Sequence, residues 1–227
     1  MSKIDKNTKG VAMFDRTQWV LTVMSIALSV QLSQPVAAAV PVGKTVQTAQ
    51  TNSSNAARKV YEEGVQLYNQ GMGESRRSAI VKWEEALKLY RKASNKEGQA
   101  LSLLSLGRVY SDLGEKQKAL EYLGQSLLLF RAVDDGRGEA LTLSNMASVK
   151  RAQNNLTEAL NDIESSIKII ENLRTKNTNP ELRRLYIFTL QERYKFYIDL
   201  LMQLHQANPN SGYDVKASEA RKRATNH

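Results

Sequence analysis

Apolar residues recur along most of the chain at the spacing of an α-helix. In the segment 98–137, Leu103, Leu106 and Tyr110 lie three and four residues apart, and Ala119 and Leu123 continue the pattern after a short polar break. Positions three and four apart share one face of a helix, so each run predicts an amphipathic helix with one buried side. Only short runs are rich in β-branched residues, so no sheet is expected. The predicted fold class is all-α.

The helical pattern repeats every forty residues. Segment 98–137 aligns with 138–177 without a gap. The matched pairs are Leu103 with Leu143, Leu106 with Met146, Gly107 with Ala147, Ala119 with Ala159, Leu123 with Ile163, and Ser126 with Ser166. An earlier copy, 58–97, matches with three extra residues, which are expected in its central loop GMGESRR. Three helix–turn–helix repeats are therefore predicted, at 58–97, 98–137 and 138–177.

Small residues occupy matched places within these copies. Glycine inside a helix costs about 1 kcal/mol relative to alanine, so Gly107 is expected to allow a close approach to a second helix at Ala119. Gly114 is predicted to adopt a positive φ in the turn between the two helices. Asn155 and Glu158 have the spacing of a capping box. In the third copy Lys150 replaces the aromatic Tyr110, so that contact must differ there.

The order of small and large residues at Gly107, Ala119, Leu123 and Ser126 resembles the signature of the tetratricopeptide repeat, although its usual period is 34 residues. The resemblance implies an α-solenoid whose first helices line a concave groove that holds a peptide or protein partner. Asn145 matches a place where related repeats use asparagine to fix a ligand backbone. Arg108 and Arg151 are expected to hold a carboxylate by two parallel N–H bonds. The candidate groove residues are Leu104, Arg108, Ser111 and Asp112 in the second copy and Ser144, Asn145, Ser148 and Arg151 in the third.

The N-terminus has the composition of an export signal. Basic residues from Lys3 to Arg16 precede the uncharged run Trp19–Leu32, which is followed by the small residues Ala37, Ala38 and Ala39. This order predicts a signal peptide over 1–39, cleaved after Ala39, and a periplasmic or secreted protein. An uncleaved signal that anchors the chain to a membrane is the alternative. Residues 40–57 are polar, show no helical stripe, and are expected to form a flexible linker.

A long helix is predicted after Pro180, where Tyr186, Leu190, Tyr194 and Leu201 form an apolar stripe. The rest of 178–227 is expected to form a turn and a truncated final helix. Residues 58–223 also resemble the repeat region of CHAT-domain proteins, in which a caspase-like protease follows the repeats. Those proteases need a catalytic Cys and His, and this chain contains no cysteine. The resemblance implies either a stand-alone repeat module or the remnant of a truncated protease-like protein. Homo-oligomer formation through the C-terminal helix is left open.

The absence of cysteine excludes a cysteine nucleophile and thiolate metal sites, and no other cluster of side chains predicts catalysis. The adjacent pairs Glu84–Glu85 and Asp134–Asp135 are poor acid/base pairs because neighbours on a helix do not face each other. His205 has no second ligand nearby, so no metal site, cofactor or enzymatic activity is predicted. The net charge is +9, but basic and acidic residues are interspersed, and no specific nucleic-acid binding is expected. The predicted function is protein–protein interaction, and a basic protein that binds nucleic acid or a membrane surface is the rival interpretation.

Overall fold

The computed structural model describes residues 43–71 and 73–225, with side chains from residue 53 onward. Residues 45–227 form one compact unit. Its elements are α2 (Gly43–Asn69), α3 (Gly73–Lys92), α4 (Lys96–Asp112), α5 (Lys116–Ala132), α6 (Gly136–Ala152), α7 (Leu156–Lys176), α8 (Pro180–Ala207), the 3-10 turn η1 (Pro209–Ser211) and α9 (Tyr213–Thr225). No strand occurs in this described part of the chain, so the all-α prediction is confirmed.

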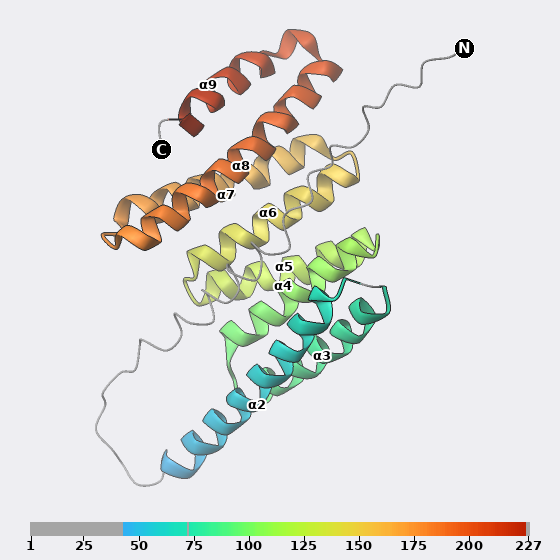
Figure 1. Cartoon of the computed structure of the whole chain (residues 1–227), viewed down its shortest axis with the longest axis vertical. Coiled ribbons are helices and arrows are strands. Elements are labelled where there is room, and N and C mark those ends of the chain that lie inside the picture. The colour runs from blue at the N-terminus through green and yellow to red at the C-terminus, as the bar shows by residue number, and fades with distance from the viewer. Residues whose placement is uncertain (1–42, 72, 226–227) are drawn as a thin grey trace. The chain divides into compact units, whose positions relative to one another are not determined.

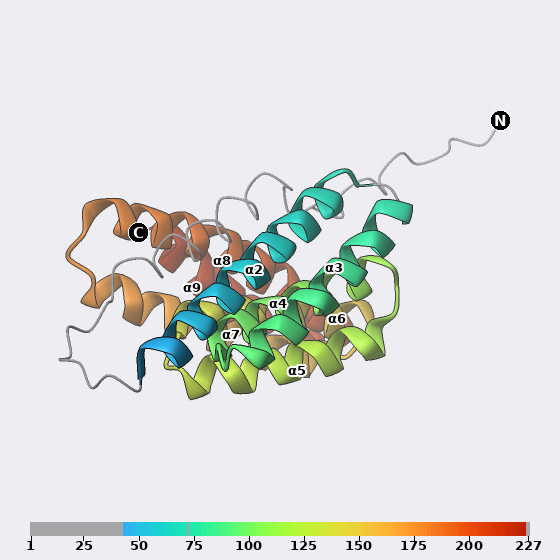
Figure 2. The ribbon, with the colours of Figure 1, turned by 90° about the horizontal axis from the view of Figure 1, so that it is seen from below.

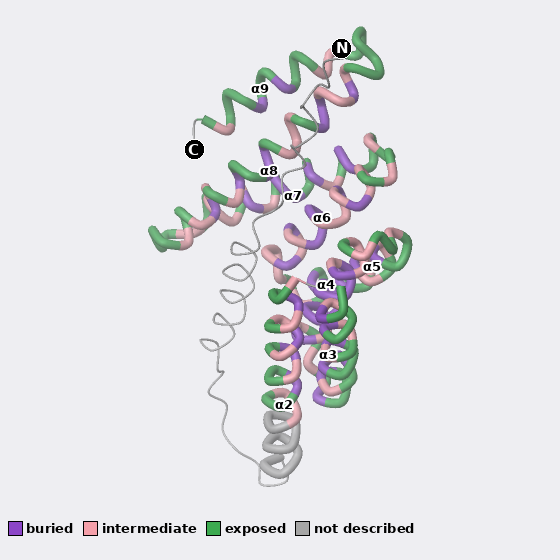
Figure 3. The backbone as a smooth tube through the Cα atoms, turned by 45° about the vertical axis from the view of Figure 1, so that its right-hand side comes forward, coloured by how far each residue is buried: buried purple, intermediate pink, exposed green. Residues whose placement is uncertain are grey.

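The α-helices stack in chain order as antiparallel pairs, which is the arrangement of an α-solenoid (Figures 1 and 2). We call α2, α4, α6 and α8 the first helices of these pairs and α3, α5, α7 and α9 the second helices. Buried residues gather on the sides where neighbouring helices meet, and exposed residues lie on the outward sides (Figure 3). Each pair therefore buries its apolar side against its own partner and against the next pair.

Helices α4, α5 and α6 each span 17 residues and are joined by three-residue turns. One residue in every turn is left-handed, with φ of 54° at Ser94, 82° at Gly114, 55° at Asp134 and 64° at Asn154. The residue after each of these donates its N–H back into the preceding helix, as Glu115 does to the carbonyl of Tyr110 at 2.9 Å. This pattern is a Schellman motif. The predicted positive φ at Gly114 is confirmed.

The close approach predicted at Gly107 is confirmed. A Cβ atom added there would lie 2.6 Å from Cγ of Leu123 and 3.1 Å from the carbonyl oxygen of Ala119. Glycines also set the distance between successive pairs: a Cβ at Gly138 would lie 2.3 Å from the ring of Phe130. Bulk on one helix and a glycine on the next therefore fit together both within a pair and between pairs.

The contact made by Tyr110 differs in the next pair, where Lys150 takes its place. In α4 and α5, Tyr110 and Tyr122 stack with their rings nearly parallel and their centroids 5.3 Å apart. Forty residues later the same two places hold Lys150 and Asp162, whose Nζ and Oδ2 atoms are 2.7 Å apart. An ion pair thus replaces an aromatic stack at the same contact in the next pair.

Three local predictions are wrong. The expected linker is helical from Gly43 onward, although its Thr, Ser and Asn residues are weak helix formers, because the helix extends toward the N-terminus from the buried Ala57 and Tyr61. The three extra residues of the first copy lengthen α3 to 20 residues, and the turn before it stays short. Asn155 begins α7 without a side-chain capping bond, whereas Asp135 accepts bonds from the N–H groups of Arg137 and Gly138.

The stripe along α8 packs as predicted. Tyr186, Leu190, Tyr194 and Leu201 are buried in one cluster with residues of α7 and α9. Hydrogen bonds to α7 add to this packing, since the hydroxyl of Tyr194 donates to Oε1 of Glu171 at 2.6 Å. Helix α8 begins with Pro180 in its first turn, and Asn179 caps it. The predicted signal peptide over 1–39 lies outside the described residues.

Candidate binding face of the first helices

The turn geometry identifies equivalent residues near the ends of three first helices. Left-handed Gly71, Gly114 and Asn154 donate their N–H groups to the carbonyl oxygens of the residues three positions earlier, at 3.1, 3.0 and 2.9 Å. Those acceptors are Tyr68 in α2, Ser111 in α4 and Arg151 in α6. The three side chains therefore occupy one structural position, from which each can meet the following first helix.

We call the contact between two successive first helices a step. At the step from α2 to α4, a three-residue cluster joins the two helices. The hydroxyl of Tyr68 donates to Oδ2 of Asp112, and Nε of Arg108 donates to that hydroxyl at 3.0 Å. The guanidinium of Arg108 lies 5.5 Å from the centre of the Tyr68 ring, within the range of a cation–π contact. Burial raises the pKa of Tyr68 to about 12, so the phenol stays protonated and keeps donating at neutral pH.

At the step from α6 to α8, Arg151 makes the contact. Its Nε donates to Oε1 of Gln203 at 3.1 Å, and its guanidinium lies 5.2 Å from the centre of the Phe196 ring. The chemistry matches the first step, because a guanidinium again lies against an aromatic ring and shares a hydrogen bond with the neighbouring helix. Both arginines are held in place by these contacts.

The middle step, from α4 to α6, has small side chains. The residues equivalent to Tyr68, Arg108 and Asp112 are Ser111, Ser148 and Ala152. The hydroxyl of Ser148 donates within its own helix, to the carbonyl of Ser144 at 3.1 Å. Ser111 and Ser148 are half-buried and Ala152 is exposed. We call Ser111, Ser148 and Ala152 the small-residue step.

Six of the eight predicted groove residues reach the surface. Asp112 is exposed, and the others are half-buried: Arg108, Ser111, Asn145, Ser148 and Arg151. Leu104 and Ser144 are only 1% and 8% exposed, so the expectation that they lie on an open face is wrong. Residues 100–107 of α4 are all buried, so every side of the helix is covered there and Leu104 lies in the interior.

Neither arginine has the surroundings that were predicted. Each was expected to hold a ligand carboxylate, but Arg108 is engaged by Tyr68 and Arg151 by Gln203 and Phe196. Asn145 also makes a local bond, from Nδ2 to the carbonyl of Leu141 at 2.8 Å. Tyr68 was not predicted as a site residue, although the alignment of the repeats places it at the position of Ser111. Phe196 and Gln203 carry no such signal, because α8 follows a longer α7 and departs from the forty-residue spacing.

The other side chains considered as candidate catalytic or metal-binding groups either make structural contacts or are exposed. Asp134 is the left-handed turn residue and Asp135 caps α6, while Glu84 and Glu85 are exposed on α3. Nδ1 of His205 lies 3.8 Å from Oδ1 of Asp214. Within the described residues, 43–71 and 73–225, no group of three or more metal-ligating side chains occurs. None of the described helices is long and apolar enough to cross a membrane.

Comparison with known families gives a match to the two central helix pairs. Residues 100–172 match the tetratricopeptide repeat family. The match runs from within α4 to within α7, the two pairs that keep the forty-residue spacing. Tetratricopeptide repeats generally mediate protein–protein interactions, and proteins built from them are generally non-catalytic scaffolds.

One of the similar solved structures has the same fold. The crystal structure of BtubC (BKLC) from P. vanneervenii has a TM-score of 0.55 and 14% sequence identity, over 81% of this chain and 76% of that one. Two crystal structures of nearly identical TPR-like repeats from Podosopora anserina are 17% identical, with TM-scores of 0.42 and 0.41, over 78% of this chain and 89% of each of theirs. No curated protein sequence matches the chain. The similarity to the first structure shows a tetratricopeptide-type α-solenoid.

Proposed function

We propose that this protein is a non-catalytic scaffold that binds a protein or peptide partner across the face of its first helices. The observation that carries the proposal is the pair of positioned guanidinium groups: Arg108 lies against Tyr68, and Arg151 lies against Phe196. These side chains are half-buried, so they present polar groups at the surface. They lie on the helices that line the ligand face in solenoid repeats.

Fixed side chains favour binding because they are ordered before the partner arrives. Immobilising a flexible arginine costs roughly 0.5–1.5 kcal/mol at an interface, and the contacts to the neighbouring helices meet that cost during folding. Arginine and tyrosine are also among the residue types that most often dominate binding energy. Asn145 and Ser111, on the same face, add adaptable donors and acceptors.

The test compares two triple variants of equal composition. Arg108→Ala/Asn145→Ala/Arg151→Ala removes polar groups from the first-helix face. Arg91→Ala/Asn161→Ala/Arg184→Ala removes the same residue types from exposed places elsewhere. Each chain, and the wild type, is used to capture proteins from a cell-envelope extract of the source organism after crosslinking. We expect a captured partner that the first variant loses and the second retains.

Two controls make the result specific. Circular dichroism melts show whether the first variant is still folded at the temperature of capture. A photo-crosslinking residue at Ser148, on the first-helix face, is compared with one at Ser165, which is exposed on α7. Capture that both variants retain, that falls steeply with salt and that crosslinks equally from both places would reject the proposal and favour a basic surface-binding protein.

The setting of this scaffold is part of the same proposal. The basic and apolar N-terminal segment supports export, and fractionation of the native protein tests it, since recovery in the cytosol would contradict it. The resemblance of residues 58–223 to the repeat region of CHAT-domain proteins supports an origin beside a caspase-like protease.

A further inference from the structure

We propose that the partner presents an acidic segment to three arginines around the joint between α7 and α8. This inference rests on the proposed function, because it names the chemistry of one part of the same partner. The three residues are Arg137 at the start of α6, Arg174 in the last turn of α7 and Arg183 near the start of α8. We call them the arginine corner.

The start of α6 lies against the last turns of α7. A Cβ atom added at Gly136 would lie 3.5 Å from Cγ2 of Ile169 and 3.6 Å from Cδ1 of Leu173. Arg137 is the residue after Gly136, and Arg174 is the residue after Leu173. These two arginines therefore extend from helix turns that touch each other.

Arg183 extends from the side of α8 that faces α7. It precedes Tyr194 by about three helical turns, and the hydroxyl of Tyr194 donates to Oε1 of Glu171 in α7 at 2.6 Å. Arg174 lies one turn after Glu171, on the same side of α7. Arg174 is thus flanked by α6 on one side and by Arg183 on the other. Most residues at the joint itself are exposed (Figure 3).

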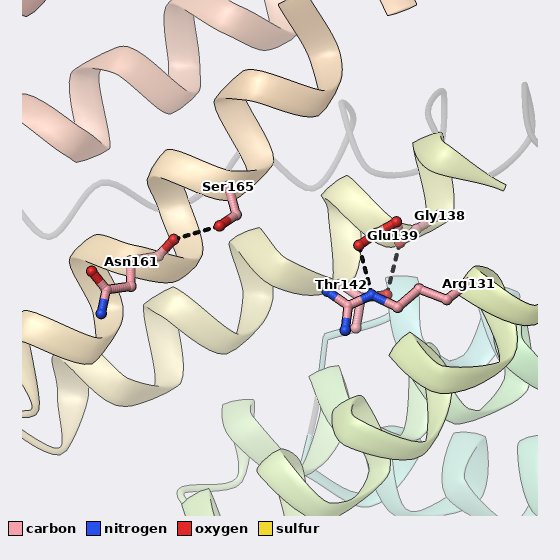
Figure 4. A network of polar contacts seen from close by, with 6 residues as sticks. All are labelled: Arg131, Gly138, Glu139, Thr142, Asn161 and Ser165. Carbon is pink, nitrogen blue, oxygen red and sulfur yellow. Dashed lines mark hydrogen bonds and ion pairs between the residues drawn. The ribbon is translucent and has the colours of Figure 1, made fainter. Parts of the chain in front are cut away.

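The preceding joint, between α5 and α6, shows how such charges are balanced. There Nε of Arg131 lies 2.7 Å from Oε1 of Glu139 (Figure 4). Asp134 and Asp135 add two more acidic residues to that joint. Forty residues after these three acids the chain has Arg174, Thr175 and Asn179. The joint between α7 and α8 therefore lacks the acids that balance the arginines of the preceding joint.

Two of the three guanidinium groups have a donor without an acceptor. Nη2 of Arg137 and Nε of Arg174 are buried and have no hydrogen-bond partner among the described residues. No ion pair among the same residues includes any arginine of the corner. A buried N–H group without an acceptor is unfavourable. Arg137 and Arg174 therefore gain a hydrogen bond, and give none up, when they turn toward a carboxylate that arrives from outside.

The burial of the corner favours the side chains of a peptide over a flat anionic surface. Arg137 and Arg174 are half-buried between helices, where a carboxylate on a flexible side chain reaches them and a bilayer surface does not. A carboxylate also matches the planar guanidinium with two parallel hydrogen bonds. Because three arginines face one exposed acid, Glu181, the corner attracts a segment with more than one aspartate or glutamate.

The experiment uses short fluorescein-labelled peptides on the full-length chain, with binding followed by fluorescence anisotropy. One peptide contains aspartate and glutamate, and its control has asparagine and glutamine at the same positions. We expect the acidic peptide to bind saturably and at least tenfold more tightly than the control. Equal affinity of the two peptides would overturn the proposal.

Three variants test whether the arginines act by position or by charge alone. Arg174→Lys keeps the positive charge but loses the planar donor geometry, so it is expected to weaken the acidic peptide at least fivefold. Arg183→Gln should weaken it at least tenfold. Arg184→Gln is the matched control, because this exposed neighbour points about 100° away around the helix; its effect should be less than twofold. Equal losses for Arg183→Gln and Arg184→Gln would overturn the proposal.

Vesicles containing phosphatidylglycerol and a DNA duplex are titrated in parallel as rival anions. Both should bind more weakly than the acidic peptide and should be unaffected by Arg174→Lys. Tighter binding of either one that is lost in Arg174→Lys would assign the corner to phosphate groups and overturn the proposal.

Partner capture separates this inference from the proposed function. Circular dichroism melts first establish that each variant is folded. Capture that depends on Arg108 but is unchanged in Arg174→Lys and Arg183→Gln would reject the arginine corner and leave the proposed function standing. Capture that depends on Arg174 and Arg183 but not on Arg108 would support the corner and reject the face described above.

Discussion

At the scale of single residues, glycine and serine determine how closely the helices approach. Gly107 and Gly138 each face a large side chain on another helix, Leu123 and Phe130 respectively. Ser126 is fully buried, and its hydroxyl donates across to the carbonyl of Ala100 at 2.8 Å, so its polar group is satisfied at the contact. The energetic consequence is that helix propensity and packing oppose each other at these places, and packing should prevail.

Gly107→Ala should destabilise the protein. Alanine gains about 1 kcal/mol of helix propensity, but overpacking a closely packed core costs about 1–3 kcal/mol. Since Leu123 is fully buried and cannot move aside, we expect the free energy of unfolding to fall by about 1 kcal/mol, measured by urea denaturation. Gly124→Ala is the matched control within α5, where nothing lies within 4 Å. It should raise stability, and a loss of equal size there would contradict the argument.

At the scale of elements, equivalent contacts are made with different chemistry. The stack of Tyr110 on Tyr122 and the ion pair of Lys150 with Asp162 hold the two helices of successive pairs at the same place. Burial raises the pKa of the Asp162 carboxyl, although Lys150 opposes this effect. A raised pKa means that Asp162 stabilises the fold most at pH below about 4, its unfolded value, and less as pH rises through its folded value.

The pair can be exchanged for the stack. Lys150→Met leaves the half-buried Asp162 without its partner, and we expect a loss of roughly 2 kcal/mol at pH 7. Lys150→Tyr/Asp162→Tyr copies the contact of the preceding pair and should restore or exceed wild-type stability, because well-packed side chains often replace an ion pair without loss. Urea denaturation from pH 3 to pH 7 measures both. A double variant less stable than Lys150→Met would show that the two contacts are not interchangeable.

The joint between α7 and α8 contains a buried charge. Arg193 is 6% exposed, and its Nε donates to the hydroxyl of Ser166 at 2.7 Å. Burial lowers its pKa to about 10. A base with a lowered pKa opposes folding at neutral pH, and this penalty shrinks as pH rises through that value toward the unfolded pKa.

Arg193→Met should therefore raise the free energy of unfolding by about 1–4 kcal/mol at pH 7, since replacing a buried charge by an apolar group of similar volume is often stabilising. The gain over wild type should narrow between pH 9 and pH 11. Comparing the two chains at each pH cancels the titration of the tyrosines, which both contain. A variant less stable than wild type at pH 7 would mean that the bonds of Arg193 to Ser166 and to the carbonyl of Thr189 outweigh the desolvation of the guanidinium.

At the scale of the whole molecule, the features that recur in each repeat could be predicted from the sequence. The forty-residue period and the turn at Gly114 could be predicted because their residues recur at fixed spacing. The engagement of Arg108 by Tyr68 could not, since it joins residues forty apart through side-chain directions that no pattern of apolar positions encodes. The departure of α8 from the period hid Phe196 for a different reason, because the longer α7 shifts every later residue out of register.

Stacking in chain order also determines how the molecule should unfold. Gly138 lies at the joint between the pairs α4–α5 and α6–α7, where a Cβ would meet the buried ring of Phe130 at 2.3 Å. Gly138→Ala should therefore uncouple α6–α9 from the earlier helices, because each pair is stabilised only by its neighbours. Trp83 in α3 reports on the earlier part when Trp19 is replaced by phenylalanine. In the parent chain, circular dichroism and Trp83 fluorescence should change together on urea denaturation.

In Gly138→Ala the circular dichroism signal should be lost at a lower urea concentration than the change in Trp83 fluorescence. Gly136→Ala, where the nearest atom is at 3.5 Å, should keep the two transitions together. Coincident transitions in Gly138→Ala would show that the solenoid remains cooperative across a damaged joint.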